Sequence, residues 1–81
     1  MAKQEIDKSK VEENSRMQVI AFLECSKTSI GEMTDEIREQ TKTRISYGTV
    51  NNWLSRKSVI RLDNLELIIN HMRAKGYIFE I

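Results

Sequence analysis

Apolar residues recur at helical spacing in four stretches of the chain, and polar or turn-forming residues separate these stretches. This period is typical of amphipathic helices. We expect helices at about residues 12–26, 30–40, 46–55 and 62–75, with Gly76 ending the last one. Pro is absent, and Gly occurs only three times in 81 residues. The sequence therefore predicts a single, mainly helical domain with a small core.

Each expected helix has an apolar stripe that predicts a buried face. The stripes comprise Met17, Val19, Ile20, Ala21, Phe22 and Leu23; Ile30, Met33 and Ile37; Val50, Trp53 and Leu54; and Leu62, Leu65, Ile68, Ile69 and Met72. Val59 and Ile60, in the linker before the last helix, are expected to pack under it. His71 lies within this last apolar stretch, next to Met72, so we expect a structural role for it. Cys25 is expected to serve as a small packing residue.

Cap residues indicate where two of these helices begin. Thr28 or Ser29 can cap the helix at residues 30–40, and Glu32 stands three positions after Ser29, where it can complete a capping box. Ser46 can cap the helix that follows it, because its hydroxyl can accept a hydrogen bond from a free backbone N–H.

The two ends of the chain differ from the domain at residues 12–76. Residues 1–11 alternate in charge and hold few apolar side chains, which predicts a flexible arm; an arm that reaches along DNA is the alternative. Residues 77–81 are rich in β-branched and aromatic residues, which predicts a strand. A single strand has no partner in a helical chain. We therefore expect a homodimer joined by this strand, through Tyr77, Ile78, Phe79 and Ile81.

The helix expected at residues 46–55 has an unusual polar face. Gly48, Asn51, Asn52 and Ser55 point away from its apolar stripe, and Arg56-Lys57 follows them. A solvated helix face usually carries Glu and Lys, whereas these amides and hydroxyls can hydrogen-bond to base edges and phosphates. We interpret this segment as a DNA-recognition helix, with an ordinary solvated helix as the alternative.

The charge distribution supports this interpretation, although the net charge is only +1. Residues 28–41 contain four acids and one base, for a net charge of −3. Residues 42–61 contain five bases and no acid, for a net charge of +5. A basic stripe around the expected recognition helix favours contact with phosphate, and chance clustering of surface charge is the alternative.

Residues 17–81 resemble the Cro and phage-repressor type of helix-turn-helix protein. The resemblance rests on the stripe of the second helix, on Ile45-Ser46 opening the third, on Val50 and Trp53, and on the apolar fourth helix after Arg56-Lys57. It implies a mainly α, four-helix, lambda-repressor-like domain, with a short C-terminal β-strand used in dimerisation, and a third helix in the major groove of DNA. With the flanking polar residues included, the DNA-binding residues are expected to be Arg44, Ser46, Tyr47, Gly48, Thr49, Asn51, Asn52, Ser55, Arg56 and Lys57.

The chain departs from this family in the turn before the third helix. Arg44 stands where the family usually has Gly or a small residue, and the stretch from Ile37 to Ile45 is several residues too long. Either the second helix is extended or the turn is enlarged. The small residue that the family has inside the second helix corresponds best to Thr34.

Several classes of function lack their residues in this sequence. One His and one Cys do not make a metal site, and no serine has a His and an acid at a spacing that suggests nucleophilic catalysis. No glycine-rich phosphate loop is present. We therefore expect no enzyme activity, no cofactor and no small-molecule substrate. The sequence contains no apolar run of membrane-span length and no apolar signal-peptide core, and its lone Cys25 agrees with a reducing compartment, so we expect a cytoplasmic protein.

Together these patterns favour a sequence-specific transcriptional regulator of bacterial or phage type that binds double-stranded DNA as a homodimer. It would occupy an operator and block or position RNA polymerase. One alternative is a protein-interaction module, such as an antitoxin or a phage inhibitor of a host protein, that does not read DNA. An RNA-binding helical protein is a further alternative, which the low aromatic content of 6% disfavours.

Overall fold

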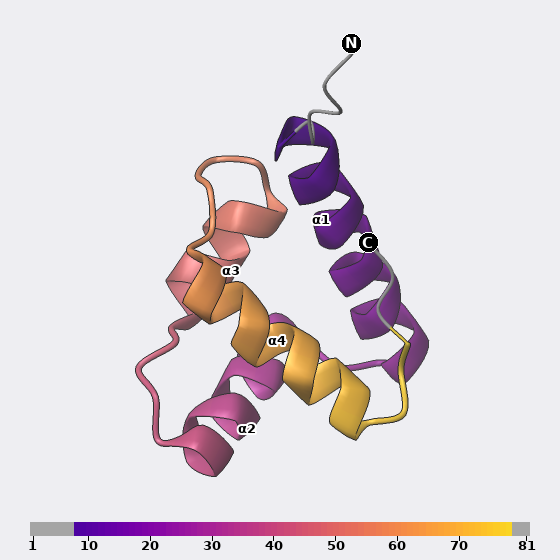
Figure 1. Cartoon of the computed structure of the whole chain (residues 1–81). Helices are drawn as coiled ribbons and strands as arrows, with labels where there is room; N and C mark the ends of the chain where they lie inside the picture. The colour runs from indigo at the N-terminus through magenta and orange to yellow at the C-terminus, as the bar shows by residue number, and fades with distance from the viewer. Residues whose placement is uncertain (1–7, 79–81) are drawn as a thin grey trace, which may run out of the picture.

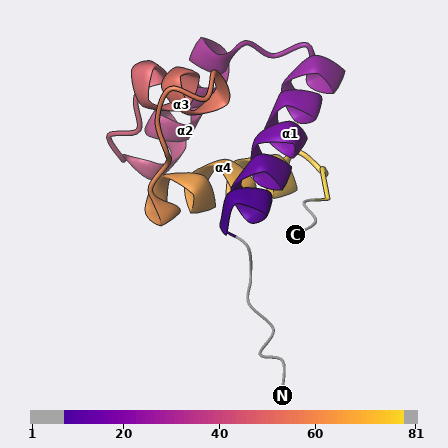
Figure 2. The same ribbon diagram turned by 90° about the horizontal axis from the view of Figure 1, so that it is seen from above.

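The computed structural model describes the backbone of residues 8–78 and the side chains of residues 12–78. The described residues form four helices: α1 (Lys8–Ser26), α2 (Ile30–Thr41), α3 (Tyr47–Leu54) and α4 (Leu62–Ala74). Helix α3 packs on both α1 and α2, and α4 packs on α2 (Figures 1 and 2). None of these helices combines the length and the apolar character needed to cross a membrane.

Helix α1 begins at Lys8, earlier than the predicted start at residue 12. Residues 8–11 contain neither Pro nor Gly, and Lys is a good helix former. Apolar periodicity is the sequence signal for a helix, and residues 8–11 hold only one apolar residue, so they give no such signal. Residues 8–11 of the predicted arm thus belong to α1, and residues 1–7 lie outside the described part of the chain.

The capping box predicted at the start of α2 is confirmed. The Ser29 hydroxyl accepts a hydrogen bond from the Glu32 N–H at 3.1 Å, and the Glu32 carboxylate accepts one from the Ser29 N–H at 3.0 Å. The backbone bond to Ser29 lowers the pKa of Glu32. This carboxylate also lies near the positive end of the helix dipole, where a negative charge is favourable.

The stretch between Ile37 and α3 is long because the second helix is extended and the turn after it is also enlarged. Helix α2 extends to Thr41, and a turn of residues 42–46 follows it. Lys42 has φ +57°, the left-handed conformation that Gly would adopt at low cost, and its N–H donates to Arg38 O at 2.9 Å. The Arg38 guanidinium then donates to Ile45 O at 3.0 Å and ties the end of the turn back to α2.

The predicted limits of α3 and α4 agree closely with the structure. Ser46 caps α3, since its hydroxyl accepts from the Thr49 N–H at 3.2 Å. Gly76 has φ +85° and follows the C-cap of α4. The Gly76 N–H donates to Arg73 O and the Tyr77 N–H donates to Met72 O, which is the Schellman arrangement that ends a helix.

The core lies where α1, α2, α3 and α4 meet. It comprises Val19, Phe22, Leu23, Met33, Ile37, Ile45, Val50, Trp53, Leu54, Ile68 and Met72. Ile20, Ile30, Ile60, Leu65, Leu67, Ile69 and Tyr77 pack against it while partly exposed. Thr34 is fully buried, and its hydroxyl donates to Ile30 O at 3.0 Å, so the small residue expected inside α2 has a packing role.

Several predicted core positions are wrong. Met17 is 52% exposed, and Arg16 beside it is buried instead. Val59 and Leu62 are exposed, because they lie in and just after the irregular linker, where helical spacing does not determine burial. Cys25 is also exposed, on the outer side of the last turn of α1.

The predicted C-terminal strand is not confirmed at Tyr77 and Ile78, which are outside any strand. The Tyr77 ring packs edge-on against Phe22, with ring centroids 5.4 Å apart, so this residue contacts its own chain. Ile78 is 78% exposed. Phe79 and Ile81, the other two residues expected at the dimer contact, lie outside the described residues.

Candidate nucleic-acid interface

Helix α3 has one buried apolar face and one exposed polar face. Val50, Trp53 and Leu54 point into the core, and Val50 and Trp53 are fully buried. On the other side, Tyr47 is about half exposed, and Gly48 and Asn52 are exposed. Because the helix itself carries no charged residue, its outer face presents an aromatic ring, bare backbone and amide groups to solvent.

The remaining predicted polar positions of α3 are less free to contact a ligand. Thr49 and Asn51 are only partly exposed. Besides capping the helix, the Ser46 hydroxyl is hydrogen-bonded to the Thr49 hydroxyl at 2.9 Å. The Ser55 hydroxyl donates to Asn51 O at 2.7 Å. Ser46, Thr49 and Ser55 therefore stabilise the two ends of the helix.

The turn after α3 exposes Arg56 and Lys57. The Arg56 N–H donates to Trp53 O at 3.1 Å, and the Lys57 N–H donates to Asn52 O at 2.8 Å, which forms a second Schellman arrangement. Arg56 occupies the left-handed position at φ +65° that Gly occupies after α4. Both basic side chains are exposed.

The turn before α3 contributes a further basic residue. Arg44 is exposed, and it lines a cleft of about 480 Å³ between this turn and the first half of α4. Arg61 lies on the far side of the cleft, where its guanidinium is 3.3 Å from the Asp63 carboxylate. Asp63 thus offsets the charge of Arg61, whereas no acidic partner among the described residues is found for Arg44.

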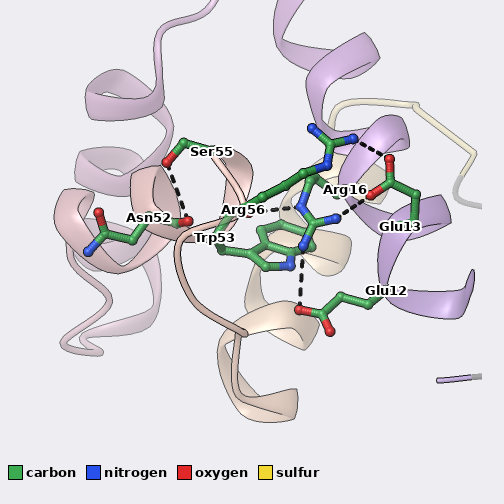
Figure 3. Close-up of polar contacts among 7 residues, drawn as sticks. All are labelled: Glu12, Glu13, Arg16, Asn52, Trp53, Ser55 and Arg56. Atoms are coloured by element: carbon green, nitrogen blue, oxygen red, sulfur yellow. Dashed lines mark hydrogen bonds and ion pairs between the residues drawn. The ribbon is translucent and has the colours of Figure 1, made fainter. Parts of the chain in front are cut away.

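Sequence patterns did not reveal that α1 is joined to the end of α3 by charged groups (Figure 3). The buried Arg16 donates from Nε to Trp53 O at 2.8 Å, and its guanidinium carbon lies 5.8 Å from the centre of the Trp53 ring. The same guanidinium pairs with Glu13 and lies 3.7 Å from Glu12. Glu13 in turn pairs with Arg56. A weak signal was available, because Arg16 shares the helical phase of the buried Val19.

These contacts favour the ionised form of Glu13. The hydrogen bond from Arg56 is the main cause that lowers the pKa of the Glu13 carboxyl, and Arg16 lowers it further. The Nε1 atom of Trp53 is an exception to the usual pattern, in which a buried indole N–H finds a hydrogen-bond partner. This atom is buried and has no hydrogen-bond partner among the described residues.

A second cleft, of about 440 Å³, lies at the other end of the molecule between α1, α2 and the end of α4. His71 lines it, is buried, and packs edge-on against Phe22 with ring centroids 5.9 Å apart, consistent with a structural role. Glu36 and Lys75 pair across the cleft at 2.6 Å. Among the described residues, no group of His, Cys, Asp and Glu side chains is arranged to hold a metal ion.

No family model, curated protein or solved structure matches this chain. The residues of α3 and the charges around it are therefore the features that bear on function.

Proposed function

We propose that this protein is a sequence-specific DNA-binding regulator that places α3 in the major groove. The observation that carries the proposal is the outer face of α3. It exposes Tyr47, Gly48 and Asn52 without any charged side chain, while the opposite face is anchored in the core through Val50 and Trp53. A rigid helix with exposed amide groups suits the reading of base edges, which needs fixed hydrogen-bond geometry.

Each exposed group has a proposed role. Asn52 is the best candidate for a base contact, most naturally the N7 and N6 edge of adenine, because an amide matches both atoms at once. Arg44, Arg56 and Lys57 lie in the turns before and after α3, where they can contact phosphates and fix the position of the helix in the groove. The absence of acids from residues 42–61 favours this arrangement electrostatically.

Gly48 supports the proposal in a different way. A Cβ atom built at this position meets no other protein atom within 4 Å, so nothing in the described fold requires glycine there. Gly within a helix costs roughly 0.5–1 kcal/mol relative to Ala. A glycine retained on the exposed face of α3 is therefore explained if the backbone at this point approaches another molecule closely.

We further propose that the protein acts as a homodimer that occupies an operator, with residues 77–81 pairing as strands between two copies. The alternating sequence of this segment and the exposed Ile78 support the pairing. Two-fold symmetry would then place two copies of α3 on half-sites roughly 34 Å apart. Since Tyr77 packs on Phe22, it would contribute less to such pairing than the residues after it.

A protein-interaction module that does not read DNA is the second candidate. Two exposed apolar side chains favour this candidate: Val59 and Leu62 are 75% and 77% accessible and lie close in sequence near the start of α4. On this alternative these side chains contact a partner protein, and α3 serves only as a core helix.

Selection from a pool of random duplexes, followed by titration of the selected and a shuffled duplex, tests the proposal. We expect the selected duplex to bind more tightly and Gly48→Ala to bind more weakly while unfolding at a higher temperature. Val59→Ser with Leu62→Ser serves as the control for the second candidate, and we expect its DNA affinity to be unchanged. Failure to select any duplex, or full affinity in the Gly48→Ala variant, would contradict the proposed use of α3.

A further inference from the structure

The end of α3 is held by α1 through both its backbone and a side chain. Arg16 binds the backbone oxygen of Trp53, and Glu13 binds the Arg56 guanidinium (Figure 3). Glu13 and Arg16 also pair with each other, so the three charged groups form one connected chain from α1 to the turn after α3. In the same view, the Asn52 amide points away from this chain of charges, on the other side of α3.

The backbone at Arg56 indicates that its side chain matters. A residue with a Cβ atom is strained at φ +65°, and Gly76 occupies the corresponding position after α4 without that strain. Glycine would therefore suit the backbone better than arginine. Strain retained at one position is informative when the side chain makes a specific contact, and here the contact is with Glu13.

We propose that Glu13 is a positioning residue, whose carboxylate holds the Arg56 guanidinium ready to bind a phosphate of DNA that lies on α3. This inference rests on the proposed function. It assigns to α1, which carries none of the expected DNA contacts, a part in setting the affinity for DNA. Arg16 supports it from within the protein, by fixing Glu13 and the Trp53 carbonyl together.

The geometry favours positioning over masking of Arg56. The pair uses Nη2 of Arg56, whereas a guanidinium has five N–H donors, so the other donors remain available for a phosphate. The Arg56 side chain is 55% exposed despite the contact. Glu13 is also partly neutralised by Arg16, so it is not a lone negative charge that repels DNA.

If Glu13 already holds the Arg56 side chain in one conformation, less side-chain entropy is lost when Arg56 binds a phosphate. A free arginine side chain samples many rotamers, and fixing one such side chain in an interface has a cost that corresponds to a roughly two- to tenfold change in affinity. Glu13→Gln should therefore weaken binding by a factor in this range. Simple electrostatics predicts the opposite sign, because removal of a negative charge near DNA should strengthen binding.

A double-mutant cycle with Glu13→Gln and Arg56→Ala tests the proposal on the full chain, with the selected duplex as probe. We expect Glu13→Gln to weaken binding in the wild-type background and to have no effect when Arg56 is already Ala. Glu12→Gln is the matched control, because Glu12 contacts Arg16 and makes no described contact with Arg56. It should leave the affinity unchanged. Thermal unfolding of each variant separates these effects from losses of stability.

The outcomes distinguish this inference from the function on which it rests. Tighter binding by Glu13→Gln would mean that Glu13 masks Arg56, and an equal loss in the Arg56→Ala background would mean that Glu13 acts elsewhere. Either result overturns the positioning role while DNA binding by the wild-type chain stands. A wild-type chain that binds no duplex overturns both the function and the inference.

Discussion

The substitutions Lys27→Gly and Arg56→Gly should stabilise the protein by similar amounts but should differ in their effect on DNA binding. Both residues follow a helix with positive φ, +54° at Lys27 and +65° at Arg56. The left-handed conformation costs an L-residue about 1–2 kcal/mol. Glycine adds about 0.5–1 kcal/mol of entropy cost from the unfolded chain. The difference favours glycine by about 0.5–1 kcal/mol at each position, which raises Tm by roughly 2–8 °C in a domain of this size.

Alanine at the same two positions isolates the backbone effect. Lys27→Ala and Arg56→Ala remove the side chain but keep the strain, so each should unfold at a lower temperature than its glycine counterpart. The end of α1, which precedes Lys27, lies far from α3 in both views (Figures 1 and 2). The two Lys27 variants should therefore bind DNA like the wild type, and the two Arg56 variants should lose affinity equally.

Thermal unfolding followed by circular dichroism and titration of a labelled duplex measure the two effects separately. If the glycine and alanine variants were equally stable at both positions, the left-handed conformation of Lys27 and Arg56 would be refuted. Wild-type affinity in Arg56→Gly would refute the phosphate contact, since this variant keeps a favourable backbone and lacks only the side chain.

Four further predictions concern the core, the groove, pH and assembly. Trp53→Ala should cost about 3–5 kcal/mol, because Trp53 is fully buried, and a variant that stays fully stable while losing DNA binding would show that the ring contacts DNA. Asn52→Ala should cost about 1–3 kcal/mol on the selected duplex and much less on a shuffled one; equal losses on both would indicate a backbone contact instead. Burial lowers the pKa of His71 below 6.5, so the unfolded chain binds the proton more readily than the folded protein does, and stability should fall as pH drops through 6.5 towards the folded pKa. Because this is the only histidine, one NMR titration measures its pKa, and a value at or above 6.5 would contradict the prediction. Deletion of residues 79–81 should convert a dimer into a monomer with weaker operator binding, and sedimentation that finds the full chain monomeric at tens of micromolar would exclude the dimer.

Local chemistry explains why the sequence predicted the helix limits well. The capping box at Ser29, the cap at Ser46 and the stop at Gly76 each depend on residues within a few positions, so they can be read directly from the chain. The buried stripes of α2 and α3 follow from the same local periodicity. The start of α1 was missed because residues 8–11 contain too few apolar residues to show a helical period.

Contacts between distant residues explain what the sequence did not predict. Arg16 is buried because its partner is the backbone of Trp53, 37 positions away, and Glu13 meets Arg56 across 43 positions. Charged residues are rarely buried without such partners, so the sequence pattern alone favours exposed side chains for both Arg16 and Glu13. Met17 was predicted to be buried but is exposed, because long-range contacts place Arg16 on the side of α1 that faces α3.

The most direct test of the central claim, that α3 and its flanking basic residues bind DNA specifically, is the affinity for a selected and a shuffled duplex as salt increases. If each copy in a dimer places Arg44, Arg56 and Lys57 on phosphates, log affinity should fall against log salt with a slope of roughly −5. The selected duplex should remain the tighter ligand at every salt concentration, because base contacts release few ions. Identical affinity for both duplexes, or binding that does not change with salt, would contradict the account.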